Sequence, residues 1–340
     1  MSLASALRAN DPSQLPSRRD EDWRWTDLRA LLRVLPPPSP AVASVAANLS
    51  VELPGARQTV FANGRLLGEA GAARGVVVRR FVAATAQTSH HVEAPIAVAA
   101  GETLVLIDSF EGQAADYVRD AATPITVGPN ASVERIVLLD DAADAVSVAL
   151  TEVHLAPGAR FAQTVLTTGA RRQRFETGVA HPGQGASVRL DGLYLLDGQT
   201  HADATSEVVH DGRDGLTSQL TKGVVSGQGR GVFQGRIVVR PGADGTDARM
   251  GHHALILGER AEVDAKPELE IYADDVSCAH GNTVGALDEA ALFYMRQRGM
   301  PDGLARRVLT EAFLNEVVDR IEHDGARDVA RAWLAERLAR

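Results

Sequence analysis

The sequence predicts a mainly β fold in which a β-solenoid is flanked by helical regions at both ends of the chain. The 340 residues are 45% hydrophobic but only 4% aromatic. Val, Leu, Ala and Ile must therefore build the interior, and these side chains suit closely stacked strands. Intervals of 14 to 16 residues separate five glycines in turn-like clusters, namely Gly198, Gly212, Gly227, Gly242 and Gly258. Each interval fits one long strand with its corner, although periodicity alone leaves an antiparallel meander open.

The first 55 residues are expected to form a helical region followed by a linker. Residues 17–20 resemble a capping box, and apolar side chains follow at helical spacing, namely Trp23, Leu28, Leu31 and Leu32. This pattern predicts a helix over residues 17–33. The prolines within residues 36–40 cannot continue a helix, because each lacks an amide donor, and they predict the linker.

Residues 56–285 are expected to form the β-solenoid, because short Val-rich runs bounded by Gly, Asp and Asn dominate there. Asn63 and Gly64 mark an early tight turn between two strands. The notable break in this pattern comes at residue 286, where the hydrophobic period changes to that of helices.

Residues 286–340 are accordingly predicted to form a C-terminal helical domain. Asp288 is the expected N-cap of its first helix, and Gly299 with the following Pro301 marks the end of that helix. A second helix with a broad apolar stripe is expected to end before Asp324 and Gly325, which separate it from a third helix.

The charge and the missing motifs exclude several classes of function. The formal net charge is −9, so most of the surface would repel nucleic acid. The sequence has no phosphate-binding loop and only two lysines, Lys222 and Lys266, so any ATPase would be another chain. It also lacks the common enzyme signatures, a signal peptide and a membrane-spanning run. We therefore expect a cytoplasmic protein that is not an enzyme and contacts no membrane.

Cys278 and His280 are the candidate metal-ligating residues. In a strand, residues two positions apart share a face at a separation of about 6.6 Å, so a thiolate and an imidazole could approach one metal ion or cluster. Both ligands suit iron or zinc, but two ligands leave a tetrahedral site half empty. Because Cys278 is the only cysteine, the missing ligands would have to come from a second protein. The alternative is a buried cysteine beside a hydrogen-bonded core histidine.

Other polar residues favour structural roles. The adjacent histidines at 252–253 would point to opposite faces of a strand, which disfavours joint ligation. His201, Asp203 and His210 surround a predicted corner, where polar side chains commonly satisfy backbone groups. The aspartates at 274–275 could indicate the acidic pair of a polysaccharide-cleaving β-helix enzyme, but neighbouring strand positions diverge.

The segment 266–299 resembles the C-terminal signature of the SufB/SufD family of iron–sulfur cluster assembly proteins. The match runs through Lys-Pro-Glu-Leu-Glu-Ile, Ala-Asp-Asp-Val, Cys-Ala-His-Gly and Val-Gly-Ala-Leu-Asp-Glu, and it continues through residues 292–300. Residues 201–205 and 233–237 also look like the family core, and residues 21–26 look like its N-terminal helix.

This resemblance implies a right-handed parallel β-helix that pairs with SufB through its C-terminal strands. It implies that the C-terminal helices bind the ATPase SufC, with candidate docking residues Leu292, Phe293, Tyr294, Arg298 and Phe313. ATP would act only through SufC. Cys278 and His280 would be ligands of a nascent iron–sulfur cluster shared with SufB, so this chain alone would hold no cofactor. In isolation it could form a homodimer.

Two features indicate a SufD-like rather than a SufB-like member. Gly281 follows His280 where SufB-like chains usually carry Glu, and the segment 284–288 replaces a more polar, Lys-containing stretch. A SufD-like chain is implied to be a non-catalytic scaffold that lends the histidine and contributes to iron acquisition. The alternatives are a SufB-like scaffold and, more remotely, a stand-alone β-helix metal or carbohydrate-active enzyme. The region around residues 80–120 is short for the family, so its structure stays open.

Overall fold

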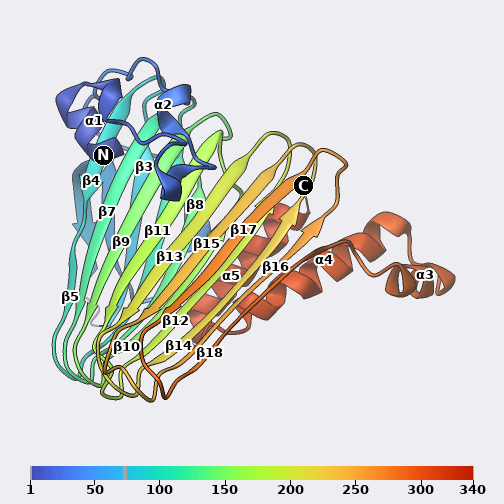
Figure 1. Cartoon of the computed structure of the whole chain (residues 1–340). Helices are drawn as coiled ribbons and strands as arrows, with labels where there is room; N and C mark the ends of the chain where they lie inside the picture. Colours follow the sequence, from blue (N-terminus) through green and yellow to red (C-terminus); the bar gives the residue numbers. More distant parts are fainter. Residues whose placement is uncertain (1, 72–74, 340) are drawn as a thin grey trace.

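The computed structural model describes residues 2–71 and 75–339 and shows a β-solenoid built from two facing sheets (Figure 1). From β6 onward each coil contributes one strand to each sheet, so neighbours within a sheet are alternate strands in sequence. In the described residues, the ladders between strands are parallel except for the β1–β2 hairpin. The predicted solenoid is therefore confirmed, and an antiparallel meander is excluded.

Within the described residues, the first sheet has the spatial order β18-β16-β14-β12-β10-β8-β6-β3-β1-β2. Its strands are β1 (Arg57–Ala62), β2 (Arg65–Ala70), β3 (Val76–Ala83), β6 (Thr103–Gly112), β8 (Ser132–Asp140), β10 (Arg160–Thr167), β12 (Ser187–Leu196), β14 (Leu216–Val225), β16 (Asp247–Ile256) and β18 (Ser277–Gly285). The second sheet has the order β17-β15-β13-β11-β9-β7-β4, and β5 also pairs with β7. Its strands are β4 (Ser89–Glu93), β5 (Ile96–Val98), β7 (Val118–Val127), β9 (Val146–Leu155), β11 (Arg172–His181), β13 (His201–His210), β15 (Arg230–Val239) and β17 (Glu262–Ile271).

The register explains the glycine spacing in the sequence. Ser187 of β12 lies opposite Leu216 of β14, which in turn lies opposite Asp247 of β16. One coil thus takes 29 and then 31 residues, and a glycine interval of 14 to 16 residues corresponds to half a coil. The predicted tight turn is also present, because Asn63 and Gly64 have positive φ angles of 50° and 79° and join β1 to β2.

Apolar side chains fill the space between the sheets, but charged side chains are buried with them in the early coils. Asp108 accepts hydrogen bonds at 2.7 Å from both Arg79 and Arg135. Arg135 also donates to the side-chain oxygen of Gln163 at 2.8 Å. Each of these buried charges therefore has an opposite charge and further hydrogen bonds, which offset the cost of removing it from water.

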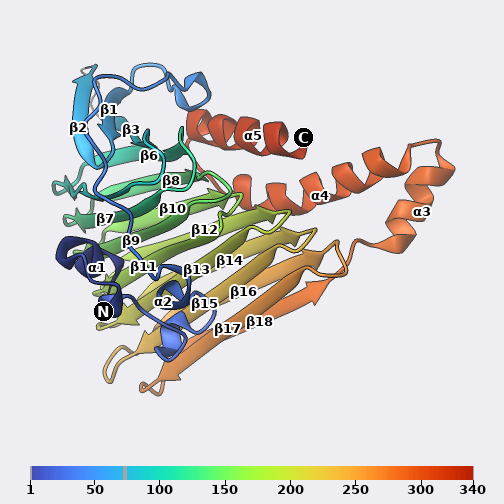
Figure 2. The ribbon, with the colours of Figure 1, turned by 90° about the horizontal axis from the view of Figure 1, so that it is seen from above.

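Residues 3–35 lie across the outer face of the second sheet (Figure 2), whereas residues 51–53 pack beside the C-terminal helices. The single helix predicted over residues 17–33 is wrong. Thr26 instead donates a hydrogen bond to buried Asp203, and Nε2 of His201 lies 3.2 Å from the carbonyl oxygen of Trp25. These contacts with the solenoid hold residues 25–26 in a non-helical segment. The elements before the first strand are α1 (Leu3–Ala9), the 3-10 turns η1 (Pro12–Gln14) and η2 (Glu21–Trp23), α2 (Leu28–Leu31) and the 3-10 turn η3 (Leu49–Val51).

Three helices follow the last strand, namely α3 (Glu289–Gln297), α4 (Asp302–Val318) and α5 (Asp324–Leu338). Asp288 caps α3 by accepting hydrogen bonds from the backbone N–H groups of Ala290 and Ala291, as predicted. The connection between α4 and α5 lies at residues 319–323, just before the predicted break. No helix in the described residues is long and apolar enough to cross a membrane.

The C-terminal helices divide into an anchored part and a projecting part. Leu314 and Val317 of α4 join Trp333 of α5 in a hydrophobic cluster with outward-facing residues of the first sheet, such as Ile136 and Leu193. In contrast, α3 and the start of α4 extend away from the sheets, past β18 (Figures 1 and 2). We call α3 and the first two turns of α4 the projecting arm.

Candidate functional site

The last two strands, β17 and β18, leave one end of the solenoid uncovered in the described residues (Figure 2). Each has a sheet neighbour on one side only. Every side chain of β18 except that of Cys278 is exposed, whereas β12 in the middle of the sheet is largely buried. Unpaired backbone groups on an edge strand are a template for pairing with another chain. We call this region the open end, and it includes the exposed apolar side chains Ile271, Tyr272 and Val284.

Cys278 and His280 share one face of β18, as the strand alternation predicts, and the register places this face on the interior side. Cys278 lies opposite Ala248 and His280 opposite Met250, and both of these β16 residues are buried in the core. Cys278 is partly buried, and this burial raises the pKa of its thiol above the ordinary value. The side chain of His280 is exposed and makes no hydrogen bond with the described residues. It is therefore not the buried core histidine of the alternative interpretation.

The Cys278 thiol and the His280 imidazole are two potential metal donors on the same face of β18. Their donor atoms suit iron, but binding must first displace the proton of the Cys278 thiol, since a thiolate is the form that coordinates. Among the described residues, no group of three or more His, Cys, Asp and Glu side chains could hold an ion. Two donors of suitable chemistry are therefore present, and a complete metal or cluster site would need further ligands from another molecule.

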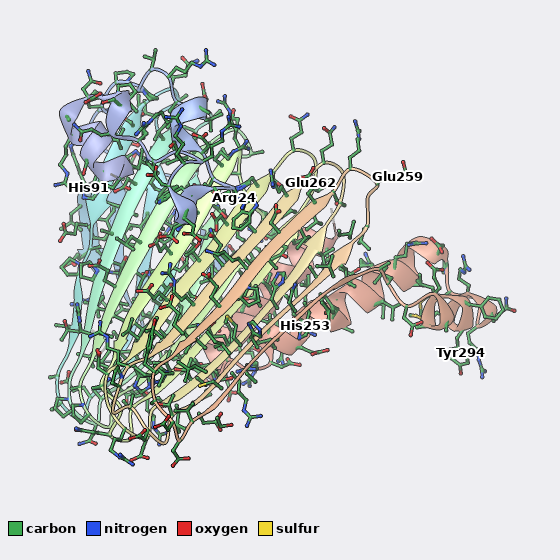
Figure 3. All side chains as sticks on the ribbon, in the orientation of Figure 1. Arg24, His91, His253, Glu259, Glu262 and Tyr294 are labelled. Carbon is green, nitrogen blue, oxygen red and sulfur yellow. The ribbon has the colours of Figure 1, made fainter. Side chains whose placement is uncertain are left out.

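The adjacent histidines of β16 point to opposite faces, as predicted. His252 is buried, with Nε2 2.8 Å from the Tyr194 hydroxyl and Nδ1 2.7 Å from Oδ1 of Asn282. This burial lowers the pKa of His252 to about 4. His253, labelled in Figure 3, lies on the outer face, with Nδ1 2.8 Å from Oγ1 of Thr283.

Of the two residues that contact His252 next to the candidate site, only one could have been found from the sequence. Asn282 carried a signal, because it continues the same-face series of residues 278 and 280. Tyr194 carried none, since it lies 58 residues before the histidine that it contacts.

His201, Asp203 and His210 make structural contacts. Asp203 accepts a hydrogen bond from Arg174 at 2.8 Å in addition to that from the N-terminal segment. The ring of His210 stacks on His181 with centroids 4.3 Å apart. Burial lowers the pKa of His201 to about 4 and that of His210 to about 3. The aspartates at 274–275 are exposed in the turn between β17 and β18.

The candidate docking residues of the helical tail fall into two groups. Phe293 and Tyr294 are 58% and 59% exposed on α3, and Figure 3 shows Tyr294 pointing away from the protein. The Arg298 guanidinium lies 5.2 Å from the Tyr294 ring centroid, so it belongs to the same surface. Leu292, however, is fully buried against α4, and Phe313 covers Lys222 of β14 at 4.3 Å. Leu292 and Phe313 therefore support the helices from within.

Comparison with known proteins identifies relatives over most of the chain. Residues 81–313 match the model of the family described as SUF system FeS cluster assembly, SufBD core domain. The chain is 31% identical to the iron-sulfur cluster assembly protein SufD of Escherichia coli (strain K12), over 75% of this chain and 59% of that protein. It is 27% identical to the iron-sulfur cluster assembly SufBD family protein Rv1462 of Mycobacterium tuberculosis (strain ATCC 25618 / H37Rv), over 96% of this chain and 90% of that protein.

A third relative is the iron-sulfur cluster assembly SufBD family protein slr0076 of Synechocystis, which is 31% identical over 60% of this chain and 45% of its own length. This chain thus spans less than two thirds of the length of the Escherichia coli and Synechocystis proteins. The matched residues 81–313 include β18, with Cys278 and His280, and reach into α4. Because the match covers well over half of the chain and takes in the open end, the chain belongs to the SufBD family of SUF-system iron–sulfur cluster assembly proteins.

Proposed function

We propose that this chain is a SufD-like, non-catalytic scaffold of the cytoplasmic SUF assembly complex and that its open end pairs with SufB. The observation that carries this proposal is the position of Cys278 and His280. They face the interior side of a terminal strand whose other edge has no neighbour in the described residues. The similarity to Escherichia coli SufD supports the SufD-like assignment.

Pairing through the open end has a direct physical basis. A second solenoid could add a strand to the free edge of β17 and another to that of β18, so that backbone hydrogen bonds along two edges fix the register. The exposed apolar side chains of Ile271, Tyr272 and Val284 would leave water in the same step. In the absence of SufB, a second copy of this chain could use the same edges and form a homodimer.

Cys278 and His280 would then be part of a cluster site to which two chains contribute ligands. His280 is the more accessible ligand, because its side chain is exposed whereas that of Cys278 is partly buried. Partial burial raises the pKa of Cys278, and its thiol must lose a proton before it can coordinate. The nascent cluster is cargo of the complex, and SufB would supply its remaining ligands. By holding iron at His280, this chain would contribute to iron acquisition.

The projecting arm is the proposed docking site for SufC. Phe293, Tyr294 and Arg298 present an aromatic and cationic surface on α3, and exposed Leu304 and Val308 continue it on α4. Aromatic and arginine side chains are enriched at the centres of protein interfaces. ATP hydrolysis would occur in SufC, and its force would reach the open end through the arm, which begins directly after β18.

A SufB-like scaffold is the second candidate. Gly281 and the single cysteine disfavour it, because a SufB-like chain is expected to provide the principal cysteine and a carboxylate. A stand-alone carbohydrate-active enzyme is disfavoured by the exposed turn position of residues 274–275.

Co-expression with SufB and SufC tests the scaffold role. We expect the three chains to copurify, and His280→Ala to assemble and melt normally but to retain little cluster absorbance per complex. Cys278→Ala should lose less. His253→Ala is the matched control, because His253 lies on the opposite face of the neighbouring strand. Normal cluster yield in a well-folded His280→Ala complex would refute the ligand role, and failure to copurify with SufB and SufC would refute the scaffold role.

The docking surface is tested by the double substitution of Phe293 and Tyr294 with Ala. We expect loss of SufC in a pull-down with no change in melting temperature. Leu66→Ala is the control, because Leu66 is 58% exposed on β2 at the opposite end of the solenoid. Truncation after Gly285 is a poorer test, since it would also uncover the sheet beneath α4 and α5. Full SufC binding by the double variant would reject this assignment.

A further inference from the structure

Three hydrogen-bonded side chains lead from the interior of the solenoid to the open end. Tyr194 of β12 and His252 of β16 are 1% and 0% exposed. The Tyr194 hydroxyl lies 2.8 Å from Nε2 of His252, and Nδ1 of His252 lies 2.7 Å from Oδ1 of Asn282 on β18. This series runs from a buried phenol to an exposed amide, and neither candidate ligand takes part in it.

Two glycines leave the space that the Tyr194 ring occupies. A Cβ at Gly223 would overlap the Tyr194 ring, and a Cβ at Gly231 would lie 2.6 Å from it. Gly223 is the β14 residue opposite Tyr194, so the ring passes over β14 and reaches His252 on the next strand of the sheet. Phe233 stacks on the His252 ring with centroids 4.7 Å apart and planes 6° apart. The imidazole is therefore held in one orientation.

The direction of the two hydrogen bonds follows from their donors and acceptors. In the described residues, the buried Tyr194 hydroxyl has no acceptor other than Nε2 of His252, so it must donate to Nε2 to avoid an unpaired buried donor. Buried His252 is neutral, because burial disfavours the imidazolium ion, and its single proton is therefore on Nδ1. Nδ1–H donates to Oδ1 of Asn282. The side-chain amide of Asn282 is left with two N–H donors.

These N–H donors lie beside the candidate ligands. Asn282 shares the interior face of β18 with Cys278 and His280, because alternate residues of a strand point the same way. Its distance from His280 along the strand is about 6.6 Å, which a bound cluster can bridge. The Nδ2 group meets no acceptor among residues 2–71 and 75–339. An anionic sulfur atom is an acceptor that a site with a thiolate and an imidazole would bring to this position.

We infer that Asn282 donates an N–H hydrogen bond to a sulfide or thiolate sulfur of the cluster at Cys278 and His280, and that Tyr194 and His252 are positioning residues for it. This inference rests on the function proposed above. Hydrogen bonds to cluster sulfur atoms help to set the reduction potential, and residues outside the direct ligands commonly affect metal affinity.

The test compares Asn282→Ala with the unaltered chain in the complex with SufB and SufC. We expect unchanged assembly, iron affinity that falls roughly 10-fold or more, and a lower reduction potential, because N–H···S bonds stabilise the more negative reduced cluster. Tyr194→Phe removes only the hydroxyl and should lower the potential by a smaller amount. Thr283→Ala is the matched control, because it removes the contact of His253 on the opposite face and should change neither quantity.

Unchanged iron affinity and potential in a well-folded Asn282→Ala complex would overturn the inference. Weaker binding to iron-free SufB would also overturn it, because the amide would then serve the partner chain rather than sulfur. His280→Ala distinguishes a failure of the role of Asn282 from a failure of the proposed function. If His280→Ala loses the cluster while Asn282→Ala keeps it unaltered, only the role of Asn282 fails; if both retain a normal cluster, the proposed function fails as well.

Discussion

Trp333→Ala tests the division of the helical tail into an anchored part and a projecting arm. Trp333 of α5 is 3% exposed, and its Nε1–H lies 3.0 and 2.9 Å from the two carboxylate oxygens of Asp140 on β8. The Arg337 guanidinium lies 4.1 Å from the Trp333 ring centroid. The indole also belongs to the cluster that joins α4 and α5 to the first sheet. Its removal should therefore weaken the contact between helices and sheet.

The expected loss can be estimated from this environment. Truncation of a buried Trp to Ala costs about 3–5 kcal/mol. Asp140 keeps its ion pair with Arg337 at 2.6 Å, so no unpaired buried charge adds to that cost. With an unfolding entropy of about 2.1 cal/mol/K per residue, a chain of 340 residues should then melt roughly 4–7 °C lower.

Thermal unfolding followed by circular dichroism is the assay. Phe293→Ala is the control, because Phe293 is exposed on α3 and its loss should cost less than about 0.5 kcal/mol. In contrast, Phe293→Ala should weaken binding to SufC more than Trp333→Ala does. Equal melting temperatures for the two variants, or a cost of less than about 1 kcal/mol for Trp333→Ala, would refute the division of the tail.

Gly223→Ala should cost about 1–3 kcal/mol in urea unfolding, because the new Cβ overlaps the Tyr194 ring; Gly281→Ala, which meets nothing within 4 Å, should cost little. Asp203→Asn should destabilise by about 1.5–3 kcal/mol, because it removes the charge from the hydrogen bonds that Asp203 accepts while Arg174 keeps its ion pair with Glu176, and limited proteolysis should then release the N-terminal segment. The free energy of unfolding should also decrease as the pH is lowered. Burial lowers the pKa of four histidines to about 3 or 4, so below pH 6.5 the unfolded chain binds more protons than the folded chain, and each site costs up to about 1.4 kcal/mol per pH unit down to its folded pKa. These histidines are His90, His201, His210 and His252. A melting temperature that stays constant from pH 7.5 to 4.5 would contradict this account.

Features that depend on near neighbours in the chain could be predicted from the sequence. Asn63 and Gly64 form the expected turn, because both tolerate the positive φ angles that a tight hairpin needs. Asp288 caps α3, because its short carboxylate reaches the free N–H groups of the first helical turn. The even glycine spacing likewise reflects a local requirement, one corner at the end of each strand.

Predictions from the sequence failed where contacts between residues far apart in the chain determine the local structure. Residues 17–33 have a helical pattern, but Thr26 contacts Asp203, which lies 177 residues away, and the helix is interrupted there. The apolar stripe of the tail did not show which side chains are covered, so Leu292 and Phe293 looked equivalent. Packing of α3 against α4 buries the first and leaves the second exposed.

The sequence by itself determined that Cys278 and His280 share a face, because alternation along one strand is a property of the extended backbone. Only the tertiary structure decided that this face opens at the end of the solenoid, and that the Asn282 amide contacts His252, 30 residues earlier. Tyr194 completes that series from a strand two further back in the sheet. The physical reason is the length of one coil. Residues about 30 positions apart become neighbours only when successive coils stack in register, and no local pattern in the chain encodes that register.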